Sequence, residues 1–95
     1  MLTRQGDTLM LEGPVTFDTV PLLVGAVDEH FRAGAGTIDF SRVTEIDSSA
    51  VALALEWLRQ GALANVGVRF VHLPQSMQNL GKLYGVSEIV MSASA

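Results

Sequence analysis

The sequence predicts an α/β domain in which a mixed sheet of four to five strands carries about three packed helices. Two observations lead to this fold class. Apolar residues recur at alternate positions in some segments and at helical spacing in others, and the two kinds of segment follow one another along the chain. The chain has 95 residues and no cysteine, which suits one hydrophobic core without disulfides. We therefore expect a single domain over residues 1–90 and a flexible tail over residues 91–95.

The N-terminal region predicts a β-hairpin followed by a helix. Over residues 8–13, Leu9 and Leu11 alternate with Thr8, Met10 and Glu12, and the turn QGD separates this segment from a shorter strand over residues 2–5. After Gly13-Pro14, Asp18 is placed to cap a helix. Apolar residues then recur at helical spacing and predict the buried side of that helix: Val20, Leu23, Val24, Val27 and Phe31.

The rest of the chain continues to alternate strands with helices. A short β-branched strand is predicted over residues 37–40, and a second helix runs from Ser48 to about Leu63. A further strand over 68–73 and a short helix over 75–85 follow, and residues 88–90 predict a last strand. The spacing places Val68, Phe70 and His72 on one face of the strand 68–73, and Met77, Leu80 and Tyr84 on the inner side of the helix 75–85.

Composition excludes several classes of partner. The net charge is -4, and the six Lys and Arg residues are scattered, so no basic patch is present to hold a phosphate backbone and we expect no nucleic-acid partner. No segment approaches the roughly 18 apolar residues of a membrane span, and charges come too early at the N-terminus for a secretory signal. We expect a cytoplasmic protein.

The second predicted helix carries apolar residues on more than one side. Its clearest apolar stripe, which we expect to be buried, comprises Val51, Leu55, Leu58 and Ala62. The opposite stripe is polar except for one leucine and comprises Ser49, Leu53, Glu56 and Gln60. Two interpretations remain open. Either the domain buries two sides of this helix, or Leu53 and Trp57 are exposed anchors of a docking face built from small residues.

The stretch Asp47-Ser48-Ser49, directly before this apolar run, also has two interpretations. Asp and Ser side chains accept hydrogen bonds from the free N–H groups of a first helical turn, so Asp47 or Ser48 caps the helix. Alternatively, Ser48 is a site of reversible phosphorylation. The helix N-terminus would stabilise the phosphate, while repulsion from Glu45 and Asp47 would project it outward.

Neither catalysis nor metal binding is predicted. Ser48 with His30 or His72 and an aspartate lacks the G-x-S-x-G turn that would expose a nucleophilic serine. Two widely separated histidines without any cysteine form no cluster of metal ligands. We therefore expect a protein that is not an enzyme and uses no metal or cofactor.

The segment TIDFSRVTEIDSSAVALAL at 37–55 resembles the STAS domain family, and the order of elements extends this resemblance over essentially the whole chain. In that family a strand ending in Asp is followed by a Ser-x-Val step, and Asp-Ser-Ser-Gly or Asp-Thr-Gly-Gly then opens a helix. Ala50 departs from this pattern, because glycine is usual there, and we expect its side chain beside the hydroxyl. The matching residues are Asp39, Ser41, Val43, Asp47, Ser48 and Ser49.

The resemblance implies one of two regulatory roles. In the anti-sigma-factor antagonist branch, the hydroxyl at the position of Ser48 is phosphorylated by an anti-sigma-factor serine kinase, which the unmodified form sequesters. In the MlaB branch, the same position lies against the ATPase subunit of a phospholipid-transporting ABC complex that maintains outer-membrane lipid asymmetry. The short chain and the stretches QGDTLMLEGPVTFDTVPLL and LGKLYGVSEIV most resemble MlaB.

We therefore expect a non-catalytic subunit that binds and regulates or stabilises the ATPase of such a transporter, beside its membrane permease. Its location would be cytoplasmic and peripheral at the inner membrane through this partner. The alternative is an antagonist that is switched by phosphorylation of Ser48. The expected partner-binding residues are Val43, Glu45, Asp47, Ser48, Ser49, Ala52, Leu53 and Glu56.

Overall fold

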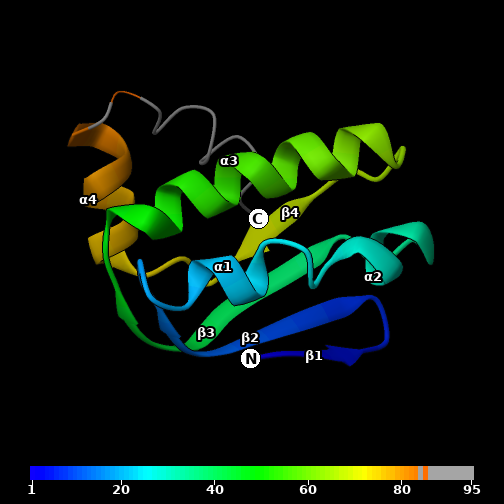
Figure 1. The fold of residues 1–95 in the computed structure, drawn as a ribbon, viewed down its shortest axis with the longest axis horizontal. Helices are drawn as coiled ribbons and strands as arrows, with labels where there is room; N and C mark the ends of the chain where they lie inside the picture. The colour runs from blue at the N-terminus through cyan, green and yellow to red at the C-terminus, as the bar shows by residue number, and fades with distance from the viewer. Residues whose placement is uncertain (84, 86–95) are drawn as a thin grey trace.

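The structure, a computed structural model, describes residues 1–83 and 85. Its elements in chain order are β1 (Leu2–Gln5), β2 (Thr8–Val15), α1 (Val20–Leu23), α2 (Asp28–Arg32), β3 (Thr37–Ile46), α3 (Ser48–Leu63), β4 (Arg69–Val71) and α4 (Gln75–Leu83). The strands form one sheet of order β1-β2-β3-β4 (Figure 1), in which β1 is antiparallel to β2 and the other neighbours are parallel. The predicted mixed α/β sheet is therefore confirmed. The predicted strand 88–90, Tyr84 and the tail 91–95 lie outside the described residues.

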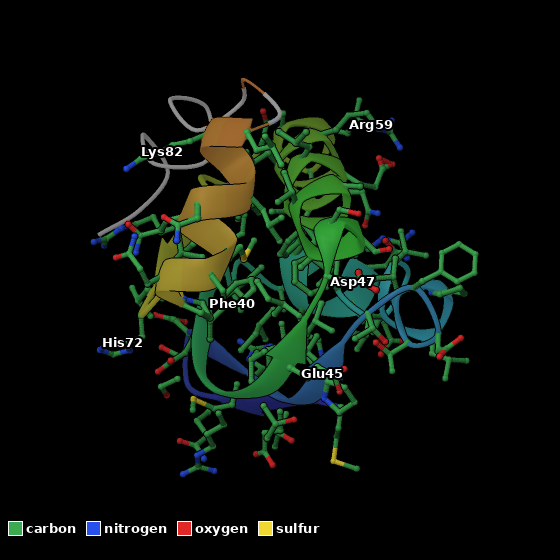
Figure 2. The ribbon with its side chains drawn as sticks, turned by 90° about the vertical axis from the view of Figure 1, so that its left-hand side faces the viewer. Phe40, Glu45, Asp47, Arg59, His72 and Lys82 are labelled. Atoms are coloured by element: carbon green, nitrogen blue, oxygen red, sulfur yellow. The ribbon has the colours of Figure 1, made fainter. Side chains whose placement is uncertain are left out.

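The core lies between the sheet and the helices. Figure 2 shows the helices above the sheet, with α3 and α4 side by side over its upper face. Phe40 and Phe70, from neighbouring strands, meet edge to face with ring centroids 5.8 Å apart, an arrangement that aromatic pairs favour. The sheet supplies a continuous apolar surface to this core, comprising Leu9, Leu11, Ile38, Phe40 and Phe70.

The inner face of α3 differs from the predicted one. The centre of that face comprises Ala50, Val51, Leu53, Ala54, Trp57 and Gly61. Leu53 is 1% exposed and Trp57 is 0% exposed, so the predicted exposure of Leu53 and its role with Trp57 as a docking anchor are wrong. Val51 is buried as predicted, whereas Leu55 and Leu58 are only partly buried and Ala62 is exposed. Because apolar residues occur on several sides of α3, helical spacing alone could not identify the buried side.

The first predicted helix is broken into α1 and α2. The Val24 carbonyl accepts hydrogen bonds from Gln60 Nε2 at 2.9 Å and from Trp57 Nε1 at 3.4 Å. A continuous helix would instead direct this carbonyl at the N–H of Asp28, which here is bonded to Gly25 O at 3.3 Å. Side chains of α3 therefore help to stabilise the break. The residue at the N-cap position of α1 is Thr19, so the prediction that Asp18 caps this helix is wrong.

Strand β4 is shorter than predicted, whereas β3 is longer. His72 has a φ of 57°, which takes its backbone out of the extended region and ends β4 at Val71. Val68 and Phe70 are consequently buried while His72 is exposed, and the prediction that all three share a face is wrong. Strand β3 continues past the predicted residues 37–40 to Ile46 and leads directly into the N-cap of α3.

Candidate partner-binding site at the start of helix α3

Asp47 lies between the end of β3 and the start of α3, where its side chain caps the helix. Its backbone is extended, with φ -132° and ψ -170°, and its Oδ1 accepts a hydrogen bond from the N–H of Ser49 at 2.8 Å. This is the geometry of an N-cap, which satisfies a backbone donor that the helix leaves free. Of the two capping candidates, Asp47 is the cap, and the side chain of Ser48 is left exposed at the first helical position.

The second carboxylate oxygen of Asp47 reaches a different part of the chain. Oδ2 accepts a hydrogen bond from the N–H of Phe17, in the loop between β2 and α1, at 2.9 Å. The bond from Phe17 has the largest effect and lowers the pKa of Asp47. Desolvation, the second-largest effect, opposes this, and bonds from Ser49 lower the pKa further. The ionised carboxylate therefore fixes the loop and the helix start relative to one another.

The structure brings several of the predicted contact residues together around this cap. Glu45, at the end of β3, and Asp47 lie at the same end of the molecule in Figure 2, and Glu45, Ser48 and Ala52 are exposed. Ser49 is half-buried, one residue further into the helix. The exposed residues form a surface of small and acidic side chains at the start of α3.

Three other expected contact residues, and Ala50, lie in different surroundings. Leu53 belongs to the core and cannot contact a partner without unfolding. Val43 is partly buried against the core, and Glu56 accepts hydrogen bonds from Arg59 Nε at 2.8 and 2.9 Å within the same helix. Ala50 is 1% exposed, so its methyl group packs inward and does not cover the Ser48 hydroxyl as expected.

The sequence reasoning missed Phe17. Its side chain is 78% exposed, although its backbone is bonded to Asp47. A large aromatic residue between Thr16 and Asp18, outside any apolar stripe, was the available signal. That signal shows that the residue lies in a loop, but not that the loop is held against the start of α3.

The first aspartate of the motif, Asp39, lies elsewhere on β3. Asp39 Oδ1 accepts from the N–H of Ser41 at 2.8 Å and lies 3.0 Å from His72 Nδ1. Burial raises the pKa of Asp39, but the hydrogen bonds from Ser41 and His72 outweigh it and lower the pKa. His72 and Asp47 are well separated in Figure 2, so this pair joins β3 to the end of β4 and is not part of the surface around Ser48.

A hollow of about 350 Å³ lies between α2 and the last turns of α3, away from the cap. The Oε1 atom of Gln60 is buried without a hydrogen-bond partner in the described part of the chain, while its Nε2 is bonded to Val24 O. The hollow is lined by Asp28, Phe31, Arg32, Gln60, Leu63 and Ala64. Leu63 is 75% exposed, so this is an open depression with no convergent set of reactive groups.

Replacing Asp47 by Asn is expected to keep the cap but release the loop. The amide has one oxygen, which can accept from Ser49 N–H, and an NH₂ group, which cannot accept from Phe17 N–H. Amide hydrogen exchange should therefore become faster at Phe17 and stay nearly unchanged at Ser49. Unchanged exchange at Phe17 would show that the Asp47 bond does not hold the loop.

The same variant should change the dependence of stability on pH. The folded pKa of Asp47 lies below its unfolded value, so its contribution is complete above the unfolded value of about 3.9 and is lost as the pH falls through the folded value. The difference in melting temperature between wild type and Asp47→Asn should shrink as the pH falls below about 4. A constant difference would contradict the role of the ionised carboxylate.

Two further observations concern metal binding and membrane crossing. Within residues 1–83 and 85, no group of three or more His, Cys, Asp or Glu side chains is placed to hold a metal ion. Over the same residues, no helix combines the length and hydrophobicity that a bilayer crossing requires.

Solved structures with this fold include anti-sigma-factor antagonists. SpoIIAA in its unphosphorylated form is 18% identical with a TM-score of 0.70, and the match covers 100% of this chain and 84% of that one. A Thermotoga maritima protein assigned as an anti-sigma-factor antagonist is 16% identical with a TM-score of 0.72, covering 95% and 81% of the two chains. At these identities the likeness shows the fold alone.

Sequence comparison identifies the family. A search of curated protein sequences found no significant match. A family model described as "MlaB, STAS domain" matches residues 1–91, which confirms the resemblance recognised in the sequence. Because this match spans nearly the whole chain, the protein is a member of the STAS domain family, in the group that the MlaB description covers.

Proposed function

We propose that this chain is a non-catalytic subunit that binds, and regulates or stabilises, the ATPase of an ABC transporter that moves phospholipids and maintains outer-membrane lipid asymmetry. The observation that carries the proposal is the exposed hydroxyl of Ser48 at the start of α3, in a chain matched by the MlaB family description over residues 1–91. Through that ATPase the protein would lie at the cytoplasmic side of the inner membrane, beside the permease.

The geometry suits recognition by a protein surface. Asp47 bonds both the first turn of α3 and the β2–α1 loop, so the surface is ordered before a partner arrives and little entropy is lost on binding. Ser48 and Ala52 are small and exposed, which allows the backbone of a partner to approach α3 closely. Glu45, Asp47 and Ser49 would provide hydrogen-bond acceptors around this contact, with Val43 and Glu56 at its margins.

The alternative function is that of an anti-sigma-factor antagonist switched by phosphorylation of Ser48. The likeness of the fold to SpoIIAA supports this alternative, as does the exposure of Ser48, which leaves the hydroxyl open to a kinase. A phosphate there would be stabilised by the N-terminus of α3 and repelled by Asp47 and Glu45, which would change the charge of the surface without unfolding the helix.

Ser48→Asp is expected to fold normally but to lose the ATPase. Asp is tolerated at a helix start, whereas an unpaired carboxylate in a desolvated contact costs several kilocalories per mole. Ser48→Thr, which keeps a hydroxyl, should retain the partner. The measurement is the yield of ATPase that copurifies with each tagged variant when it is coexpressed with the ATPase and permease of a phospholipid ABC transporter from the same organism.

Ser76→Asp is the matched control, because Ser76 is an exposed residue in the first turn of α4. It adds the same charge in the first turn of another helix and should retain the ATPase. Full recovery of the ATPase with Ser48→Asp would contradict a contact at Ser48. Failure of the wild-type chain to recover the ATPase, together with phosphorylation of Ser48 by an anti-sigma-factor serine kinase, would support the alternative.

A further inference from the structure

Two large apolar side chains are exposed in the short segment 16–23, between the end of β2 and the end of α1. Phe17 is 78% exposed and Leu22 is 81% exposed. A single exposed apolar residue is ordinary on a protein surface. These two residues, however, belong to the segment that Asp47 ties to the start of α3, so their positions are linked to the surface around Ser48.

The backbone that carries Phe17 is also held by hydrogen bonds among its neighbours in the loop. The hydroxyl oxygen of Thr19 accepts from Thr16 N–H at 2.9 Å, and the same hydroxyl donates to Pro14 O at 2.9 Å. The N–H of Thr19 donates to Thr16 O at 3.0 Å. Together with the bond from Phe17 to Asp47, these contacts present an exposed aromatic ring on an ordered loop, which is the arrangement of a binding anchor.

The two segments that meet at Asp47 are acidic. Residues 14–24 and 43–55 contain Asp18, Glu45 and Asp47 and no Lys, Arg or His. Asp18 and Glu45 are exposed, and the next charged residue of α3, Glu56, is already paired with Arg59. An apolar anchor with an acidic surround complements an apolar cleft with a basic rim.

We infer that Phe17, with Leu22 five residues further along the chain, is the apolar anchor by which this protein enters a basic-rimmed cleft on a different protein. The inference rests on the proposed function, because the partner it specifies is the ATPase that contacts Ser48. It adds the chemistry of the partner's surface: a cleft that takes an aromatic ring, bordered by Lys or Arg side chains that face Asp18, Glu45 and Asp47.

The acidic residues around Phe17 favour a basic protein surface over the other surfaces that could cover an exposed phenylalanine. An anionic membrane would be repelled by the three acids, and so would a nucleic-acid backbone. A symmetric contact with a second copy of this chain would bring the same acids against one another, which is unfavourable. Of these four surfaces, only a basic surface on a different protein would be attracted by the three acids.

The test compares Phe17→Ala with Leu63→Ala in binding to the purified ATPase subunit, measured by surface plasmon resonance. Both residues are more than 70% exposed, at 78% and 75%, and Leu63 lies at the opposite end of α3 from Ser48. Phe17→Ala should weaken binding by about tenfold or more, mainly through faster dissociation. Leu63→Ala should change it by less than about twofold, as a residue outside the contact does.

Asp18→Lys tests the charge of the partner's rim. It should slow association, and the association rate of the wild type should fall as salt is added, because steering by opposite charges is screened by ions. Equal binding by wild type and Phe17→Ala, or faster association by Asp18→Lys, would overturn the inference while leaving the proposed function intact.

If the wild-type chain does not bind the ATPase, the same variants are measured against the anti-sigma-factor serine kinase. Weakening by Phe17→Ala there would support the anchor and reject the transporter function. Binding to neither protein would overturn both proposals. Binding of the wild type to vesicles rich in phosphatidylserine, or self-association that Phe17→Ala abolishes, would also overturn the inference.

Discussion

Leu53→Glu is expected to unfold the domain at room temperature. Leu53 is 1% exposed and packs in the hydrophobic core, so the substitution removes a buried leucine, which typically costs about 2–5 kcal/mol. It also places a carboxyl group in the core, and no polar or charged residue is buried in the described part of the chain. Burying this group adds a further cost of several kilocalories per mole. These losses approach the whole stability of an ordinary domain, about 5–15 kcal/mol. Circular dichroism and a thermal melt would show whether a cooperative transition remains.

Ala52→Glu is the control for this prediction. Ala52 is the preceding residue of the same helix and is exposed, so the same new side chain should shift the free energy of unfolding by no more than about 0.5 kcal/mol. A cooperative melt of Leu53→Glu near the wild-type temperature would mean that Leu53 faces solvent. It would return the helix orientation to the one that the sequence pattern predicted.

Trp57→Ala is expected to lower the free energy of unfolding by about 3–5 kcal/mol, the usual cost of removing a buried aromatic side chain. Trp57 is 0% exposed and is the largest fully buried side chain in the described part of the chain. Its Nε1 also donates to Val24 O across the gap between α3 and the α1–α2 turn. Urea denaturation followed by circular dichroism gives the measurement, since Trp57 is the one tryptophan and the variant loses that fluorescence.

Trp57→Phe separates the two contributions of this residue. The phenyl ring keeps much of the buried volume, and Val24 O keeps its shorter bond from Gln60 Nε2 at 2.9 Å, so the loss should be clearly smaller than for Ala. Equal losses for the two variants would show that the indole N–H, rather than the volume of the side chain, governs the effect. A midpoint unchanged by Trp57→Ala would contradict the burial of this residue.

The stability predictions for Leu53 and Trp57 and the binding prediction for Ser48 concern opposite sides of α3. The side of α3 that carries Leu53 and Trp57 is sequestered in the core, whereas Ser48 and Ala52 are exposed. Substitutions on the buried side should therefore reduce binding only through loss of folded protein. Substitutions at Ser48 or Phe17 should reduce binding in a chain that remains folded, so melting and binding measurements on the same variants distinguish the two effects.

Much of the fold could be predicted because local signals agreed with one another. The alternation of strands and helices predicted the mixed α/β sheet, and the Asp-Ser-Ser stretch before an apolar run predicted a helix that the structure places at Ser48–Leu63. A cap acts through a hydrogen bond to a residue two positions away, so it can be recognised without knowing the rest of the molecule. The STAS resemblance rested on the same local motif.

The sequence by itself therefore determined the fold class, the position of α3 and the family, while the structure identified Asp47 rather than Ser48 as the cap of that helix. The tertiary structure decided which side of α3 is buried, because apolar residues on several sides of a helix satisfy its period equally, and only packing against the sheet and its neighbours selects one. It also decided the break after α1, where Gln60 and Trp57 bond the Val24 carbonyl. It placed Phe17 beside the start of α3 through a hydrogen bond between residues 30 positions apart, a contact that depends on how β2, β3 and α3 are arranged in space and so is absent from any local pattern.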